Sequence, residues 1–333
     1  MTERAQPALK VTVIATVLNE ESNVVGLIES LAHQTRIPDE IIISDGGSTD
    51  DTVERIRQAA DRYSLNVDVL QLAGCNISEG RNAAVGRTTG DIIAVTDAGV
   101  RLKPTWLEQL VTPFEKRPGR VDVVSGFFEP DPTTTFEVAM GATVLPARED
   151  INPALFLPSS RSVAFTREAW RRAGGYPEWL DYCEDVVFDI ALRRNGCVFA
   201  WAPEAVALFR PRSRLVDFWK QYYRYARGDG KAGLWPRRHA IRYGSYLAGL
   251  ALLVAGRRKR AGLLLLAIAS FLHVRRPYQR LTPWLDGMEP DEKLQAISWV
   301  PILRLVGDLA KMAGYPAGVL WRMRQGRSIT RLV

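Results

Sequence analysis

The chain has 333 residues, enough for one large domain or two smaller ones. Its hydrophobic fraction of 47% is ordinary for a globular protein, and its net charge of +7 suits an anionic substrate or an anionic membrane surface. No nucleic-acid-reading motif occurs, and the three cysteines have neither metal-ligand spacing nor a disulfide framework. We therefore expect a reduced, cytosolic protein without a nucleic-acid partner, and the polar segment Met1 to Lys10 lacks the apolar core of an export signal.

Strands and helices alternate along the first hundred residues. Strands are predicted at residues 11–16, 40–44, 67–70 and 92–97, and helices at residues 24–31, 52–63 and after 77. The strand that ends at Asp97 is apolar throughout, as is typical of a parallel strand buried on both faces. This rhythm predicts an α/β fold with a mostly parallel central sheet.

The following hundred residues are less regular. A helix is predicted after Pro104, strands at residues 121–126, 161–165 and 198–201, and helices at residues 167–173 and after 184. The Thr- and Pro-rich segment 128–157 is expected to be a flexible loop with a helical piece. We assign residues 1–235 to a catalytic domain.

The composition changes after Pro211. Two apolar stretches, residues 241–255 and 261–274, flank the basic segment 256–260, and each is shorter than the ~20 residues that a straight membrane-spanning helix needs. They predict a shallow or tilted membrane hairpin over about 241–274; the alternative is an ordinary soluble hairpin with one buried face. Residues 297–324 mix apolar and basic side chains, which predicts an amphipathic helix in a membrane interface. We assign residues 236–333 to a C-terminal helical, membrane-associated region.

Two acidic loops follow predicted strands. Residues 45–50 contain Asp45 and Asp50, and Asp97 ends the later strand. Because ligands of such sheets bind at the carboxyl ends of the strands, these acids could contact a nucleotide and hold Mg²⁺ or Mn²⁺. The plainer interpretation of Asp97 is a turn-capping residue. The glycine-rich dinucleotide motif and the P-loop motif are both absent, which disfavours an oxidoreductase and a P-loop enzyme.

An ordered set of short segments resembles family 2 glycosyltransferases with the GT-A fold, across about residues 10–230. These segments are residues 13–20, residues 42–50, Gly80-Arg81-Asn82, Asp97, Gly174-Gly175-Tyr176 and Glu184-Asp185. The resemblance implies an inverting enzyme that uses a nucleotide-diphospho-sugar, commonly with Mg²⁺ or Mn²⁺.

The resemblance also implies roles for the donor-side residues. Asn19 and Glu20 match the loop that flanks the nucleotide base, Asp45 the acid that contacts the base or ribose, and Arg81 a basic residue near the nucleotide. Asp97 matches the first acid of the metal-binding D-x-D motif. That motif reads D-A-G here, so the second acid is missing. The expected metal ligands are therefore Asp97, water and the substrate diphosphate.

Asp185 resembles the catalytic base, with Glu184 beside it, while the alternative for Asp185 is a helix N-cap. Arg224 lies in a segment similar to the Q-x-x-R-W motif of processive members, with Tyr in place of Trp. It is expected to contact the diphosphate or, equally, to belong to a basic membrane-facing helix.

Two functions remain open from the sequence. The first is a glycosyltransferase of cell-envelope polysaccharide synthesis on the cytoplasmic side of the membrane, acting on a lipid-linked, glycan or other membrane-proximal hydroxyl. The alternative is a catalytically inactive nucleotide-sugar-binding or scaffolding protein, which the missing second acid motivates.

Overall fold

The computed structural model describes residues 9–257 and 260–326, which form two compact units. The first unit ends at Glu129 and resumes over Ile151–Phe209; the second comprises Pro130–Asp150 and continues from Arg210. The predicted domain boundary at residue 235 differs from this division, and the assignment of catalysis to residues 1–235 stays a prediction. The interpretation of Met1 to Lys10 mostly concerns residues outside the described ranges, as do residues 258 and 259 of the basic segment.

The first unit is built on one eight-stranded sheet with the order β3-β2-β1-β4-β7-β6-β8-β5. The strands are β1 Val11–Val17, β2 Glu40–Asp45, β3 Val67–Gln71, β4 Ile92–Asp97, β5 Val100–Leu102, β6 Val123–Pro130, β7 Val163–Thr166 and β8 Phe199–Phe209. Strands β3, β2, β1 and β4 are parallel, but β7 pairs antiparallel with both β4 and β6, and β5 pairs antiparallel with β8. The sheet is mixed, so the prediction of a mostly parallel sheet was wrong for this second half.

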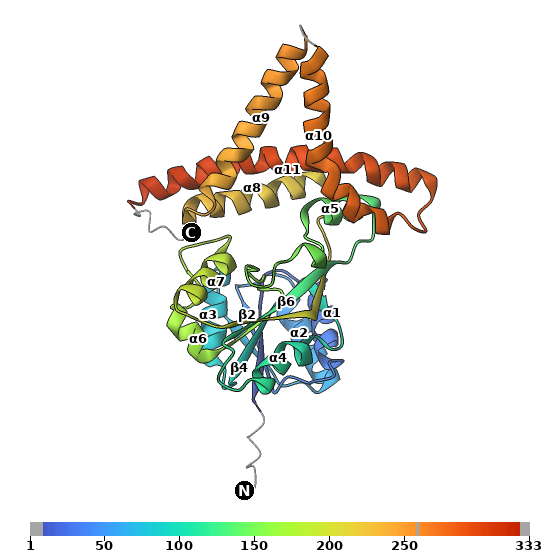
Figure 1. Cartoon of the computed structure of the whole chain (residues 1–333). Coiled ribbons are helices and arrows are strands. Elements are labelled where there is room, and N and C mark those ends of the chain that lie inside the picture. The colour runs from blue at the N-terminus through green and yellow to red at the C-terminus, as the bar shows by residue number, and fades with distance from the viewer. Residues whose placement is uncertain (1–8, 258–259, 327–333) are drawn as a thin grey trace. The chain divides into compact units, whose positions relative to one another are not determined.

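Helices cover both faces of the sheet (Figure 1). They are α1 Val24–Ala32, α2 Thr52–Tyr63, α3 Ile77–Arg87, α4 Trp106–Lys116, α6 Arg167–Ala173 and α7 Glu184–Arg194. Side chains alternate between the faces along each strand. In β1, Val11, Val13 and Ala15 join the core that α1, α2 and α4 cover, whereas Ile14 joins the core beneath α3, α6 and α7. Both faces of the parallel strands are therefore buried, which explains their continuous apolar sequence.

The second unit is helical. Its elements are α5 Thr135–Val144, η1 Arg148–Asp150, α8 Leu215–Ala232, α9 Pro236–Gly256, α10 Arg260–Leu281, η2 Thr282–Trp284 and α11 Pro290–Arg324. The segment 128–157 contains the end of β6 and the helix α5, so the predicted helical piece is present, and α5 is largely buried. Burial of α5 against its neighbours, which no local pattern encodes, stabilises that helix.

Helices α8 and α11 pack at backbone contact. A Cβ atom at Gly314 or Gly318 of α11 would overlap the carbonyl oxygens of Tyr223 and Arg227 on α8. Glycine at these two positions lets the helices approach more closely than side chains allow. One face of the predicted amphipathic helix is thus used for packing within the unit.

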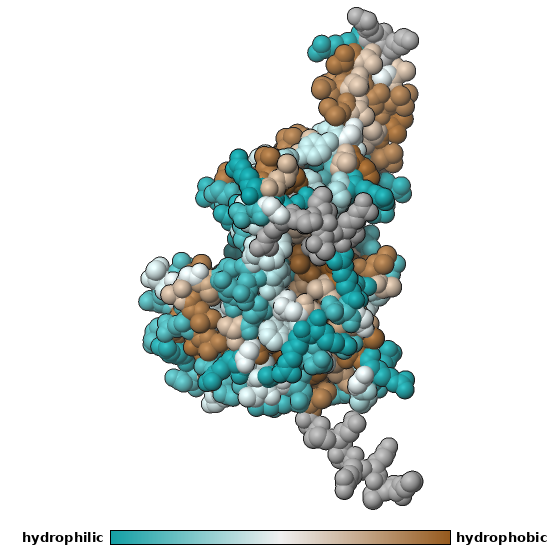
Figure 2. Space-filling view, turned by 90° about the vertical axis from the view of Figure 1, so that its left-hand side faces the viewer, coloured by the Kyte–Doolittle hydropathy of each residue, from teal (hydrophilic) through white to brown (hydrophobic). Residues whose placement is uncertain are grey.

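The two predicted apolar stretches lie in α9 and α10, which form a hairpin (Figure 1). Large apolar side chains of both helices are exposed, and apolar colour covers this part of the surface in Figure 2. The exposed residues are Ile241, Leu247, Leu250, Leu253, Val254, Leu263, Leu264, Leu265, Ile268, Phe271 and Leu272. Within residues 9–257 and 260–326, no helix is long and apolar enough to cross a bilayer.

A buried carboxylate joins the hairpin to α11. Asp308 accepts hydrogen bonds from Arg242 Nε at 2.9 Å and Tyr246 Oη at 3.3 Å, and its other partner is His273 Nε2 at 3.1 Å. Burial opposes ionisation of Asp308. The His273 hydrogen bond and the nearby cations outweigh that effect and hold the pKa of Asp308 well below its usual range.

Candidate active site

The parallel half of the sheet brings the two acidic loops to one edge. Asp45 at the end of β2 pairs with Val17 of β1, and Asp97 at the end of β4 pairs with Thr16 on the other side of β1. Both acids therefore lie at the carboxyl ends of the two parallel strands that flank β1, where ligands of such sheets bind.

The loop after β1 is tied to the loop after β2. Asn19 has a left-handed backbone (φ 54°), which Asn tolerates better than most residues. Its amide donates to Ser48 Oγ at 2.9 Å, and its side-chain oxygen accepts from the Thr49 amide at 2.9 Å. The Glu20 amide donates to Thr52 Oγ1 at 2.8 Å. The structure thus places both predicted base-flanking residues beside the acidic loop.

Asp45 is almost completely buried, at 1% exposure. Its carboxylate accepts hydrogen bonds from the amide and the hydroxyl of Ser48 and so fixes the turn that follows β2. This arrangement gives Asp45 a defined structural role, and its predicted contact with a nucleotide stays a prediction.

Helix α3 carries Arg81 close to the sheet. Asn76 caps the helix by accepting from the Ser78 and Glu79 amides. Gly80 faces the strands, because a Cβ there would lie 3.1 Å from Thr16 Cγ2. This glycine permits the close approach that places the next side chain over the end of β4.

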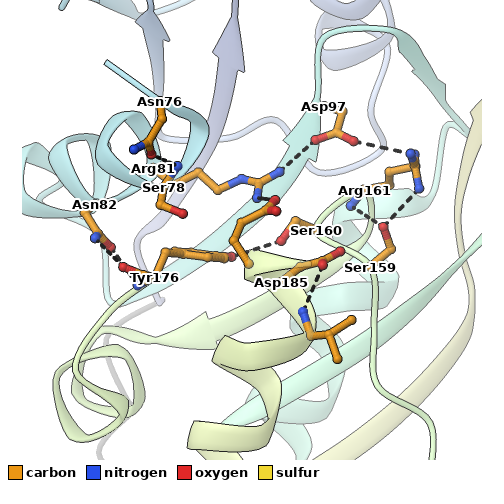
Figure 3. Close-up of polar contacts among 12 residues, drawn as sticks. Asn76, Ser78, Arg81, Asn82, Asp97, Ser159, Ser160, Arg161, Tyr176 and Asp185 are labelled. Atoms are coloured by element: carbon orange, nitrogen blue, oxygen red, sulfur yellow. Dashed lines mark hydrogen bonds and ion pairs between the residues drawn. The ribbon is translucent and has the colours of Figure 1, made fainter. Parts of the chain in front are cut away.

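Arg81 is 2% exposed and joins two predicted site acids (Figure 3). Its Nη1 donates to Glu184 Oε1 at 2.7 Å and its Nη2 to Asp97 Oδ1 at 3.0 Å. The guanidinium carbon lies 5.2 Å from the centre of the Tyr176 ring. Burial opposes the charge of Arg81, but Glu184 and Asp97 outweigh it and raise the pKa of the guanidinium. Arg81 therefore stays charged and links the predicted metal ligand to the predicted catalytic pair.

Asn82 and Tyr176 fix the position of this link. The Asn82 side chain donates to the Tyr176 carbonyl at 2.8 Å and accepts from the Tyr176 amide at 2.9 Å. The preceding Gly175 has φ 76°, a conformation that suits glycine. The Tyr176 hydroxyl lies 3.2 Å from Ser160 Oγ. The Gly80-Arg81-Asn82 and Gly174-Gly175-Tyr176 segments thus contact each other across the fold.

Glu184 and Asp185 begin helix α7 after Cys183, a non-glycine residue with φ 66°. Glu184 is buried. Burial and the neighbouring Asp185 raise its pKa to about 7, against the opposing effect of Arg81. Asp185 is half-buried, and its Oδ1 accepts from the Val186 amide at 2.8 Å. The alternative interpretation of Asp185 as a helix N-cap was wrong, because Cys183 is the N-cap of α7 and Asp185 lies within the first turn.

Arg161 is a site residue that the sequence did not predict. Its Nε lies 3.5 Å from Asp97 Oδ2, and its Nη1 donates to Ser159 Oγ at 3.2 Å (Figure 3). The antiparallel ladder between β4 and β7 pairs Val95 with Val163, and continuing this register by two residues sets Arg161 opposite Asp97. The only sequence signal was a basic residue before a short apolar strand.

Asp189 was also not predicted. It lies one turn after Asp185 and is 2% exposed, and its Oδ2 has no hydrogen-bond partner within the described residues. Burial and the Asp185 carboxylate raise its pKa well above the usual value, which favours a neutral acid one turn from the predicted catalytic base.

Asp97 is the one predicted metal ligand. The described ranges contain no group of three or more His, Cys, Asp or Glu residues that could hold a metal ion. One carboxylate still fits a hard cation that keeps its waters and takes further oxygens from a substrate diphosphate. Arg224 lies on α8 of the second unit, and its predicted contact with the diphosphate stays a prediction.

Comparisons with known proteins find similar glycosyltransferases. The family model "Glycosyl transferase family 2" matches residues 12–165. The chain is 27% identical over 238 residues to the succinoglycan biosynthesis protein ExoA of Rhizobium meliloti (strain 1021), a match that covers 66% of this chain and 68% of that protein. Over 115 residues it is 29% identical to the undecaprenyl-phosphate 4-deoxy-4-formamido-L-arabinose transferase of Serratia proteamaculans (strain 568), covering 32% of this chain and 34% of that one.

The fold also matches a solved structure. The mannosyltransferase PcManGT of Pyrobaculum calidifontis, determined with GDP-Man and Mn²⁺, superposes with a TM-score of 0.55 at 18% identity. The match covers 96% of this chain and 88% of that one. The mixed sheet of the first unit is therefore part of a GT-A-like α/β fold.

Proposed function

We propose that this chain, a glycosyltransferase, catalyses inverting transfer of a sugar from a nucleotide-diphospho-sugar to an acceptor hydroxyl. The family 2 model matches its residues 12–165. The observation that carries this proposal is the ion-pair chain from Asp97 through Arg81 to Glu184, beside Asp185. It joins the donor-side acid to the base candidate in one cluster at the carboxyl edge of the sheet.

Asp185 serves as the general base in this proposal. The acceptor oxygen attacks the anomeric carbon while its proton passes to the Asp185 carboxylate. The bond from that carbon to the diphosphate breaks, and the nucleoside diphosphate leaves with the bonding electrons. The Val186 amide, bonded to Asp185 Oδ1 at 2.8 Å, orients the carboxylate at the start of α7.

Asp97 would hold a divalent cation together with water and the donor diphosphate. When bound, Mg²⁺ or Mn²⁺ would neutralise the charge that develops on the departing diphosphate. The Mn²⁺ and GDP-Man of the mannosyltransferase PcManGT support this choice of cofactor and donor class. Arg81 keeps Asp97 and Glu184 oriented throughout.

The proposed acceptor is lipid-linked or otherwise close to the cytoplasmic face of the cell membrane. Two features of the second unit support this location. The α9–α10 hairpin exposes large apolar side chains, and residues 236–281 include many Arg and no Asp or Glu. Apolar exposure combined with positive charge suits an anionic lipid surface. The Serratia relative is named for undecaprenyl-phosphate, which supports a lipid-linked acceptor.

A donor screen tests the proposal. The full-length chain would be mixed with UDP-, GDP- and dTDP-sugars, with and without Mn²⁺, and thermal unfolding and release of nucleoside diphosphate would be recorded. We expect one nucleotide class to raise the unfolding temperature and to be consumed when an acceptor is added, with the anomeric configuration inverted. A chain that binds and cleaves none of these donors would contradict the proposal.

A further inference from the structure

Two guanidinium groups flank the carboxylate of Asp97, and they differ in how firmly they are held. Arg81 Nη2 lies 3.0 Å from Oδ1, and that side chain is 2% exposed. Arg161 Nε lies 3.5 Å from Oδ2, and its side chain is 24% exposed. The Arg161 contact is longer and more hydrated, so breaking it costs less than breaking the Arg81 contact.

Arg161 has other partners that hold it near the site when it leaves Asp97. Its guanidinium carbon lies 4.9 Å from the centre of the Phe209 ring and 5.8 Å from that of Phe128. Its Nη1 donates to Ser159 Oγ. Stacking on aromatic rings suits a guanidinium, and its planar fork of N–H groups matches the oxygens of carboxylates and phosphates.

We propose that Arg161 is an exchangeable counterion of Asp97. Before the donor binds, Arg161 occupies the position beside Asp97 that a divalent cation would take. After the donor binds, Arg161 contacts the donor diphosphate. The proposal rests on the proposed function and names a residue of that same site. In the donor-free protein, Arg161 and a divalent cation compete for one carboxylate. Once the diphosphate supplies further oxygens, the cation takes Asp97, and the planar guanidinium of Arg161 pairs with phosphate oxygens instead.

This exchange has a measurable consequence for the protein without donor. A positive group beside a single carboxylate opposes the approach of a second cation. The wild-type chain should therefore bind Mn²⁺ weakly until a nucleoside diphosphate is present. Removal of the Arg161 charge should strengthen Mn²⁺ binding in the absence of donor and weaken nucleoside diphosphate binding in the presence of Mn²⁺.

The test measures Mn²⁺ binding to the full-length, donor-free chain by electron paramagnetic resonance. We expect Arg161→Gln to bind Mn²⁺ about tenfold more tightly than wild type, and Arg161→Lys to stay near wild type because it keeps the charge. In the double variant Arg161→Gln with Asp97→Asn, the increase in Mn²⁺ affinity should disappear. That result would show that the ion binds at Asp97. Arg87→Gln is the matched control, because it removes one positive charge from an exposed pair with Asp68 elsewhere in the same unit.

A second measurement follows UDP and GDP binding by calorimetry at saturating Mn²⁺. The nucleotide that wild type prefers should bind Arg161→Gln about tenfold more weakly. Equal Mn²⁺ affinity in wild type and Arg161→Gln, or a gain that survives Asp97→Asn, would overturn the exchange. If neither nucleotide binds the wild type and dTDP does not bind either, the proposed function fails, while the Mn²⁺ titration still decides whether Arg161 competes for Asp97. Circular dichroism and thermal unfolding would establish that each variant is folded.

Discussion

Arg81 donates from Nη2 to Oδ1 of Asp97 over 3.0 Å, and this bond crosses from α3 to the end of β4. The other terminal nitrogen of Arg81 is bonded to Glu184, so both ends of its fork contact acids of the protein. The sequence resemblance predicted a basic residue near the nucleotide. The geometry favours a more specific role, in which Arg81 positions Asp97 and Glu184.

Replacement of Arg81 tests this positioning role. Arg81→Met keeps much of the volume but leaves Glu184 and Asp97 without their shared cation. We expect a loss of about 3 kcal/mol in the free energy of unfolding, because removal of one partner from a buried ion pair leaves an uncompensated charge. Urea unfolding would measure it. Arg87→Met, which breaks an exposed pair with Asp68, should cost less than about 1 kcal/mol. Similar losses in the two variants would show that the Arg81 network contributes little.

The metal prediction concerns Asp97. Because it is the only acid of its motif, Asp97→Ala should abolish the Mn²⁺-dependent part of nucleotide-sugar binding, as measured by calorimetry with and without Mn²⁺. Asp91→Ala is the matched control, since Asp91 precedes the same strand at its opposite end and accepts from the Lys10 amide. Unchanged Mn²⁺-dependent affinity in Asp97→Ala would remove Asp97 from the metal site.

The base prediction concerns Asp185. Asp185→Asn removes basicity but retains an oxygen that can accept from the Val186 amide, so the start of α7 should stay intact. We expect unchanged nucleotide-sugar binding and a transfer rate lower by at least ~10²-fold, the low end of the usual contribution of a general base. Single-turnover kinetics with bound donor would separate the two quantities. Near-normal turnover would leave Asp185 with only a structural role in the first turn of α7.

The parallel half of the fold could be predicted because its signal is local. Ile92, Ile93, Ala94 and Val95 form a continuous apolar run, and burial on both sheet faces requires such a run. In the antiparallel half, strands were predicted at 121–126, 161–165 and 198–201, but their apolar sequences do not reveal the direction of pairing. Strand β5 was not predicted, because it has three residues and is defined by its pairing with β8. Such pairing is tertiary, and a single sequence does not display it.

The site was predictable to a similar extent. The family resemblance placed Asp45, Arg81, Asp97 and Glu184 in one site, and the structure brings Asp97 and Glu184 into contact with Arg81. Spacing could not distinguish a buried Arg81 from one that faces a ligand, because that difference depends on the acids around it. Arg161 was missed because its relation to Asp97 follows from the antiparallel register of β4 and β7.

The Asp308 cluster predicts a pH dependence of stability. The pKa of Asp308 is lower in the folded protein than its usual value, so ionised Asp308 stabilises the fold fully above about pH 4 to 5. That contribution is lost as the pH falls through the folded pKa. Asp308→Asn should cost about 3 kcal/mol at neutral pH, because Arg242 and its neighbouring cations lose their counterion. The difference between wild type and variant should shrink toward pH 2 in denaturant titrations, and a constant difference would contradict this account.

The last prediction concerns the α9–α10 hairpin. We expect the full-length chain to float with vesicles that contain phosphatidylglycerol and to remain bound in high salt. Insertion would bury the exposed apolar side chains, and salt does not screen this hydrophobic free energy. Each Lys or Arg near anionic lipid adds only about 1 kcal/mol of electrostatic attraction. Leu264→Asp combined with Phe271→Asp should release the chain, because both side chains are exposed on α10.

Leu155→Asp is the matched control for this experiment. Leu155 is 73% exposed but belongs to the first unit, so its replacement should leave flotation unchanged. If a salt wash alone strips the wild type from the vesicles, the contact is electrostatic and the hairpin is not inserted. If the wild type stays monodisperse without detergent and does not float, the hairpin does not bind lipid, and the proposed membrane location is wrong while the assignment of Asp97 and Asp185 is unaffected.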